Sequence, residues 1–112
     1  MAVIVMKEVH VHLVNAIAYV VNAKKTDNGR LAETNFQRDP LDSARAAQAM
    51  EFDIDHAMYK VDNPVLAYHV MQSFKPGEIT PEEAHRIGVE FVEEITGGQY
   101  KYVIATHTDR QL

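Results

Sequence analysis

The side chains best suited to chemistry lie near the C-terminal end of the chain, in the segment YKYVIATHTDRQL. The apolar run over residues 102–105 predicts a buried strand that delivers Thr106, His107 and Asp109 to its C-terminal end. Ligands and catalytic groups collect at strand ends. An imidazole can transfer a proton near neutral pH or bind a metal ion, so His107 is the first candidate for a functional residue.

Two hydroxyl groups are further candidates. Tyr19 lies beside the apolar stripe of a predicted helix, where it is either a tyrosine at the edge of the core or a nucleophile. Because a phenol has a pKa of about 10, a nucleophilic tyrosine needs a nearby base or cation to attack phosphorus. No residue close to Tyr19 in the sequence supplies one, whereas a histidine or metal ion brought by another strand would. Ser73, at the end of a predicted strand, either contacts a phosphate or caps a turn.

The remaining histidines give weaker signals. Strand alternation places His69 on one face of its strand and His107 on one face of the last strand, and the two lie near each other if these faces coincide. His10 and His12 alternate in HVH and would face the same way on a strand end, but two histidines alone do not define a metal site. The sequence contains no glycine-rich phosphate loop, no H-E-x-x-H and no G-x-S-x-G.

Composition limits the class of protein. The 112 residues fit one domain, and the lack of cysteine excludes disulfides and thiolate metal sites. A net charge of −5 argues against nucleic-acid binding by bulk electrostatics, although Lys24, Lys25 and Arg30 form a local basic cluster or a solvated loop. No apolar run is long enough to span a membrane and no signal peptide is recognisable, so we expect a cytoplasmic protein.

Local patterns predict the elements that hold these residues. Residues 2–9 predict a strand that is buried on both faces in its first half, and helical spacing predicts a helix near residues 13–21. A long loop or weak hairpin follows over residues 24–39. The pair Asp39-Pro40 predicts the start of a helix that runs to about residue 58, with a possible break at residues 53–55. A strand is expected over residues 65–74.

The last helix is the clearest local prediction. Thr80, Pro81 and Glu83 form a capping-box signature, and Gly97-Gly98 ends the helix. Its expected core stripe consists of Ala84, Ile87, Gly88, Phe91 and Ile95. The final strand begins at residue 100. The predicted fold class is therefore α/β (α+β), with one largely antiparallel sheet and helices packed mainly on one face.

Four ordered stretches carry a resemblance to a known family: AIAYVVNAKKT, AYHVMQSFKPGE, TPEEAHRIGVEFVEEI and YKYVIATHTDRQL. Together they resemble the relaxase and mobilization nuclease family, the MobP-type enzymes of plasmids and conjugative elements within the HUH endonucleases. The resemblance covers nearly the whole chain in the order of the family's motifs.

The resemblance implies a role for each candidate residue. Tyr19 would be the nucleophile that nicks one DNA strand at an origin of transfer and retains the 5′ phosphate as a phosphotyrosyl ester. Ser73 would contact DNA near the nick, and we expect Lys24 and Lys25 of the local basic cluster to contact DNA as well. His107 would bind a divalent cation, Mg²⁺ or Mn²⁺, and Asp109 would support the site. Single-stranded origin DNA and a relaxosome accessory protein would be the partners.

The sequence departs from the family's pattern in one respect. The later His-x-His pair that would complete the metal site should begin just past Leu112. We therefore expect the chain to be the N-terminal part of a relaxase nuclease domain, lacking a C-terminal strand, with weak metal affinity and a tendency to self-associate through an open sheet edge. One alternative is an inactive fragment that serves as a non-catalytic α/β binding or assembly module, which the acidic net charge and the missing ligands favour for this chain as it stands. The other is a small metal-dependent phosphoesterase.

Overall fold

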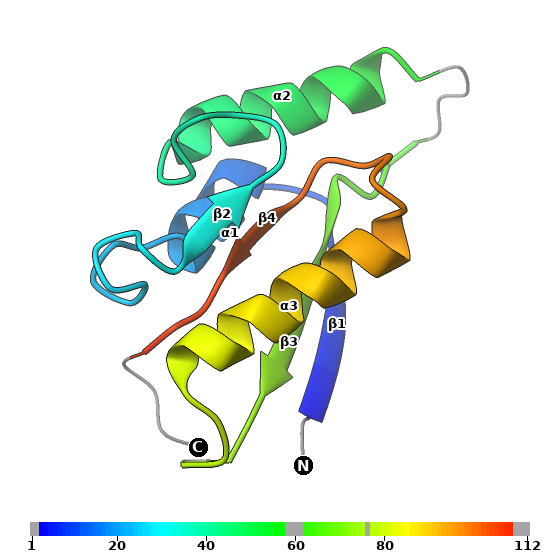
Figure 1. The fold of residues 1–112 in the computed structure, drawn as a ribbon. Coiled ribbons are helices and arrows are strands. Elements are labelled where there is room, and N and C mark those ends of the chain that lie inside the picture. Colours follow the sequence, from blue (N-terminus) through cyan, green and yellow to red (C-terminus); the bar gives the residue numbers. More distant parts are fainter. Residues whose placement is uncertain (1–2, 58–61, 76, 109–112) are drawn as a thin grey trace.

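The computed structural model describes residues 3–57, 62–75 and 77–108 of the chain. The elements follow the order β1 (Val3–Val9), α1 (Leu13–Val20), β2 (Ala32–Thr34), α2 (Ser43–Asp55), β3 (Ala67–Ser73), α3 (Pro81–Thr96) and β4 (Val103–Ala105) (Figure 1). β1 pairs with β3 and β2 pairs with β4, both antiparallel. The predicted α+β class with antiparallel strands is confirmed, and the described strands form two small sheets where the sequence suggested one.

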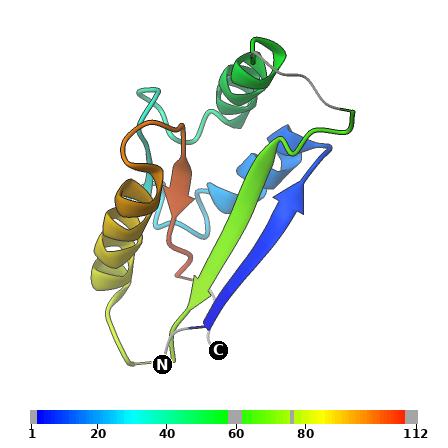
Figure 2. The same cartoon turned by 90° about the vertical axis from the view of Figure 1, so that its right-hand side faces the viewer.

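Strand β4 lies between α3 and α1, as the two perpendicular views in Figures 1 and 2 show. In the β2–β4 register, Ala32 is opposite Ala105, and both pack against the buried cluster that α1 supplies. Glu33 is opposite Ile104, and these two residues face α3. Helices therefore flank both faces of this sheet, whereas we expected them mainly on one face.

Further hydrogen bonds extend the short β2–β4 ladder at both ends, through side chains at one end and the backbone at the other. The hydroxyl of Thr34 donates to the backbone oxygen of Tyr102 (2.7 Å), and the Asn35 amide binds the backbone of Tyr100 and Tyr102 (2.8 and 3.0 Å). At the other end, Thr106 N donates to Leu31 O (2.9 Å). The sequence predicted only a loop or weak hairpin here because β2 is three residues long and carries little β-pattern; its partner is the distant β4.

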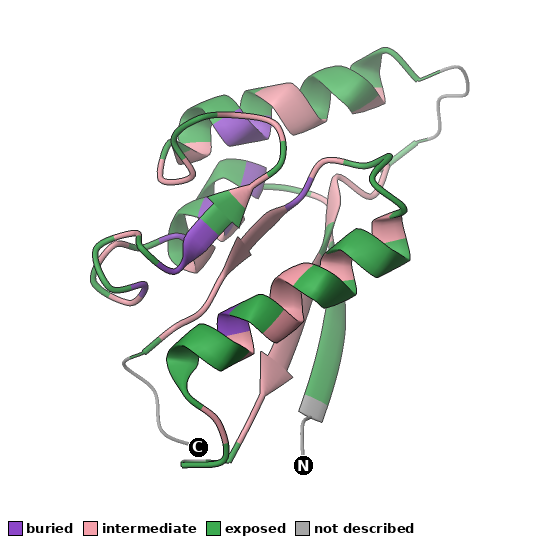
Figure 3. Cartoon of the chain, viewed as in Figure 1, coloured by how far each residue is buried: buried purple, intermediate pink, exposed green. Residues whose placement is uncertain are grey.

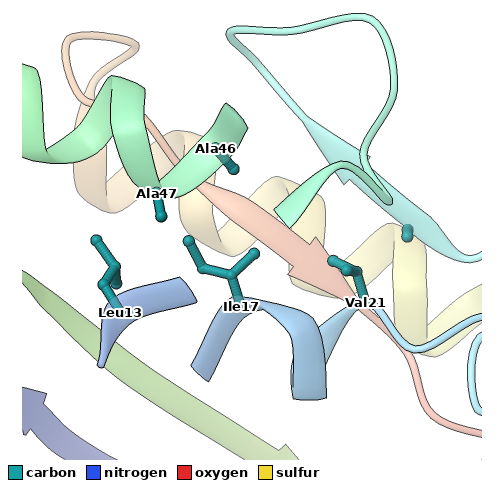
Figure 4. Close-up of a cluster of buried hydrophobic side chains, with 6 residues drawn as sticks. Leu13, Ile17, Val21, Ala46 and Ala47 are labelled. Atoms are coloured by element: carbon teal, nitrogen blue, oxygen red, sulfur yellow. The ribbon is translucent and has the colours of Figure 1, made fainter. Parts of the chain in front are cut away.

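The core is built where α1 meets α2. Leu13, Ile17 and Val21 are buried against Ala46 and Ala47 (Figure 4). Two adjacent alanines on α2 let the helices approach closely, because no larger side chain separates them. Figure 3 shows that burial is concentrated in this half of the molecule.

The start of α2 differs from the prediction. The helix begins at Ser43, and the Asp42 side chain accepts a hydrogen bond from Arg45 N (3.1 Å). Asp39 forms an earlier turn in which its carboxylate accepts from Leu41 N (2.9 Å). Asp39 and Asp42 are both suitable N-cap residues, and in the structure Asp42 caps the helix. The helix ends at Asp55, close to the break that the sequence suggested, and residue 58 lies outside the described residues.

Helix α3 begins with the predicted capping box between Thr80 and Glu83, and it ends at Gly97 in a left-handed conformation. The predicted core stripe is partly wrong. Phe91 and Ile95 are 38% and 55% exposed, while His85 is buried on the inward face. The helix is therefore rotated toward the side that carries His85 and Gly88.

Val9 and Ala67, at one end of the ribbon of β1 and β3, pack against the buried cluster. The expectation that the first half of β1 is buried on both faces is wrong, because Ile4, Val5 and Met6 are exposed. Alternate side chains of a strand point to opposite faces, so both faces of β1 lack a cover among the described residues. Within the same residues, no helix has both the length and the apolar character needed to cross a membrane.

Candidate functional site

Tyr19 lies near the C-terminal end of α1, and its side chain is 43% exposed. Leu13 and Ile17 of the same helix point into the core, whereas Tyr19 falls outside that stripe, as the helical spacing predicted. The core therefore fixes the helix while leaving the tyrosine open to solvent.

His107 lies directly against Tyr19. The centroids of the two rings are 5.5 Å apart at an interplanar angle of 69°, an edge-on contact. Nε2 of His107 is 2.8 Å from the backbone oxygen of Val20. Because a carbonyl only accepts hydrogen bonds, Nε2 carries the proton and Nδ1 of the neutral ring keeps the free lone pair. Nδ1 is thus the atom of His107 that remains for a metal ion or a proton.

Lys25 supplies a positive charge at the same place. Its Nζ lies 4.7 Å from the centroid of the Tyr19 ring, a cation–π arrangement. Thr108 N donates to Lys25 O (2.7 Å), which ties the segment after β4 to the turn after α1. We expected no cation near Tyr19 in the sequence, and this expectation is wrong. Helical spacing would not bring Lys25 to Tyr19, but the helix ends at Val20 and the chain turns back.

His69 lies on β3, opposite Lys7 of β1. Its pKa is lowered from 6.5 by partial burial, then by the charge of Lys7, its partner across β1, and by the charge of His107. The electrostatic effect of His107 supports the expectation that the two histidines lie near each other. Both the burial and the charge of Lys7 thus favour the neutral imidazole of His69.

The other predicted site residues lie farther out or outside the described residues. Ser73 is the last residue of β3, four positions beyond His69 and so about 13 Å along the strand. Lys24 is exposed, and its backbone N donates to Asn22 Oδ1 (2.9 Å). Asp109 lies outside the described residues. The structure thus brings together Tyr19, Lys25 and His107.

His10 and His12 do not form the pair that strand alternation suggested, because β1 ends at Val9. Nδ1 of His10 is 3.1 Å from the backbone oxygens of both Asn63 and Pro64, and its Nε2 is 3.2 Å from the Glu8 carboxylate. This carboxylate is the main reason why the pKa of His10 is raised. His12 is the N-cap residue of α1, with φ of 56°. Both histidines are therefore part of the local framework.

The donor atoms present do not make a complete metal site. Among the described residues, no group of three or more histidine, aspartate or glutamate side chains is arranged to hold an ion. His107 offers one nitrogen, Nδ1, and a divalent cation in a protein needs several ligands. The described part of the chain supplies one ligand of the set that the resemblance implies.

Sequence reasoning missed a second polar cluster on the opposite face of β4. His85 of α3 lies between Glu33 of β2 and Thr106, the residue before His107. The only signal was a histidine in the first half of the helix, next to Arg86, where it is easily interpreted as a surface residue. The link to Thr106 requires the β2–β4 register, which the sequence did not reveal.

Comparison with known proteins gives a consistent picture. The model of a family described as relaxase, MobA/VirD2-like, nuclease domain, matches residues 19–111, a range that includes Tyr19 and His107. The group II intron-interrupted relaxase LtrB of Lactococcus lactis subsp. cremoris is 33% identical in an alignment 120 positions long, which covers 89% of this chain and 21% of the relative. Two proteins named rlx from Staphylococcus aureus are 37% and 42% identical, over 62% and 53% of this chain and 21% and 18% of the relatives. The chain thus spans 21% of the length of LtrB. No solved structure is a significant match.

Proposed function

Because the chain belongs to the family of MobA/VirD2-like relaxase nuclease domains, we propose that it carries the nucleophile of a reaction that nicks and rejoins one DNA strand. The phenolate oxygen of Tyr19 attacks the scissile phosphorus and forms an O–P bond while the P–O3′ bond breaks. The 5′ phosphate stays on the tyrosine, the phenol gives up its proton, and the departing 3′ oxygen takes one up. The reverse reaction rejoins the strand. The proposed setting is the cytoplasm.

The observation that carries this proposal is the contact of Tyr19 with both Lys25 and His107. Attack on a phosphodiester brings the negative charge of the phenolate next to the negative charge of the phosphate. An ammonium group beside the ring stabilises that arrangement, because fixed charges aimed at developing charge lower the barrier. Exposure of Tyr19 leaves room for the strand to approach.

Binding of DNA is proposed to rest on a small patch, Lys24 and Lys25. The third basic residue of the cluster, Arg30, forms ion pairs with Asp27 (2.7 Å) and Glu82 (2.6 Å), so part of its charge is already compensated. With a net charge of −5, such a patch gives weak binding that falls with salt. Ser73 extends the proposed contact along β3, and an accessory protein that binds the same DNA would supply further affinity.

The covalent intermediate provides the direct test. The chain is incubated with Mg²⁺ and a single-stranded oligonucleotide that contains an origin of transfer, and the products are separated under denaturing conditions. We expect a protein–DNA adduct that Tyr19→Phe abolishes and that Lys25→Ala reduces about tenfold or more, in line with the loss of one charge contact in the transition state. Tyr68→Phe is the matched control, because Tyr68 is another exposed tyrosine. An adduct that survives Tyr19→Phe, or no adduct with the unmodified chain, contradicts the proposal for this chain.

A divalent cation, Mg²⁺ or Mn²⁺, is proposed to bind at His107, with Asp109 as a supporting group. Bound there, it would act as a Lewis acid toward a phosphate oxygen. Because His107 is the only ligand that the described residues bring to this place, we expect weak binding of Mn²⁺ in a calorimetric titration and a further loss in His107→Ala. Sub-micromolar affinity of the unmodified chain would refute this part of the proposal.

A second candidate function is a non-catalytic assembly module that associates with copies of itself. The observation that favours it is the uncovered apolar surface of β1, where Ile4 and Met6 are exposed on one face. β1 pairs with β3 alone among the described strands, and an unpaired strand edge recruits further strands. Light scattering at increasing concentration should then show dimers or larger species. A monomer at every concentration would rule out this candidate.

A further inference from the structure

A polar array crosses the side of β4 that faces away from Tyr19. Nε2 of His85 lies 2.8 Å from the Glu33 carboxylate, and Nδ1 lies 3.1 Å from the hydroxyl of Thr106. His85 is 7% exposed, so water does not replace these partners easily. The array joins α3, β2 and the end of β4 at one imidazole.

The chemistry of the carboxylate fixes the direction of the first hydrogen bond. An ionised carboxylate only accepts, so Nε2 of His85 carries a proton and donates it to Glu33. In the neutral ring Nδ1 is then an acceptor, and the Thr106 hydroxyl donates to it. Thr106 N donates to Leu31 O (2.9 Å) at the same time. Both the backbone and the side chain of Thr106 are therefore held.

Helix α3 contacts this face of the last strand at three alternate residues. The hydroxyl of Tyr102 donates to Glu93 (2.6 Å), Ile104 packs on Gly88, and Thr106 binds His85. These alternate residues share one face, and His107 points the other way, toward Tyr19. The contact between Thr106 and His85 is the last of the three and the nearest to the candidate site.

We propose that His85 is a positioning residue for the site on the opposite face of β4. His85 holds the side chain of Thr106 toward α3. Because His107 directly follows Thr106, this contact also fixes the direction of His107, which points toward Tyr19. The role of this contact in strand nicking rests on the proposed function, whereas its effect on the geometry of His107 does not. The Glu33 carboxylate is half exposed, and an ion pair of that kind contributes little by itself. The hydrogen bond between His85 and Thr106 is therefore the contact that positions His107.

The position of His107 is measured in the 112-residue chain through the NMR signals of its ring protons, because the ring current of Tyr19 shifts them. We expect Thr106→Val, which keeps the shape and removes the hydroxyl, to move these signals, and we expect His85→Ala to do the same. His85→Asn, which offers an amide oxygen near the position of Nδ1, should restore them. His85→Gln, which offers its amide near the position of Nε2, should not. The matched control is Arg86→Ala, since Arg86 lies on the exposed side of α3 in an ion pair with Glu90.

Unchanged His107 signals in folded Thr106→Val would overturn the proposal, and so would restoration by His85→Gln alone. If His85→Ala does not fold, Thr106→Val and His85→Asn still decide the result. Adduct formation is measured in the same variants, and a misplaced histidine should reduce it by on the order of tenfold or more. Shifted signals without any adduct in the unmodified chain would contradict the proposed function while supporting the positioning role.

Discussion

Replacing Gly88 by alanine tests how closely α3 packs on the strand that leads to His107. A Cβ atom at Gly88 would lie 2.8 Å from Cδ1 of Ile104, closer than real contacts of this kind. The misfit costs about 1–3 kcal/mol when a packed core is overfilled, and the low end applies because Cδ1 is the tip of a flexible side chain. Alanine in place of glycine within a helix gains about 1 kcal/mol. The two terms nearly cancel, so Gly88→Ala should change the free energy of unfolding by less than about 1 kcal/mol.

Ile104→Val removes the atom that causes the misfit. By itself this change should cost about 0.5 kcal/mol, the low end of the range for Ile→Val in a core, because Ile104 is only partly buried. In that background the new methyl group at position 88 has space, so Gly88→Ala should stabilise the chain by about 1 kcal/mol. The coupling between the two substitutions is then about 1–2 kcal/mol.

Urea unfolding of the four proteins, followed by circular dichroism, measures this coupling. Gly97→Ala is the matched control, because Gly97 has φ of 60° and no atom near its missing Cβ. This control should destabilise equally with Ile104 and with valine at position 104. If Gly88→Ala has the same effect in both backgrounds, the two residues do not touch and the docking of α3 is misassigned.

Three further predictions follow from single contacts. Thr80→Ala removes the side-chain half of the capping box and should cost about 1 kcal/mol in urea unfolding, whereas Thr80→Ser should be nearly neutral. Burial and the hydrogen bond to Glu93 raise the pKa of Tyr102 to about 12, so the resulting stability is complete below pH 10 and is lost as the pH rises through 12. Ultraviolet titration should show Tyr102 ionising after the exposed tyrosines, and simultaneous ionisation of all of them would be inconsistent with its burial. Burial lowers the pKa of His69, so the associated stability is present above pH 6.5 and is lost as the pH falls below it; an NMR titration midpoint at or above 6.5 would contradict this.

The elements that the sequence predicted well depend on interactions between residues close together in the chain. The capping box at Thr80 and the glycine stop at Gly97 need only a few adjacent residues, and both are present as expected. The spacing of Leu13 and Ile17 likewise placed Tyr19 outside the core. In each case the interacting groups lie within one or two turns of the same helix.

The elements that the sequence did not predict depend on contacts between distant segments of the chain. β2 has three residues and exists because β4 pairs with it, and the inward side of α3 is chosen by Gly88 and His85 rather than by its largest apolar residues. The approach of Lys25 to Tyr19 depends on how the chain turns after α1. Such contacts follow from packing between distant segments, which a periodic pattern does not encode.

The alternation of Thr106 and His107 restricts how the end of β4 can change in length. Side-chain direction in a strand has a period of two, so inserting or deleting one residue between Tyr102 and Thr106 would turn the imidazole toward α3 and the threonine toward α1. A change of two residues would restore the faces but displace the histidine by about 6.6 Å along the strand. The packing of a helix on either side therefore constrains the length of this segment as well as its composition.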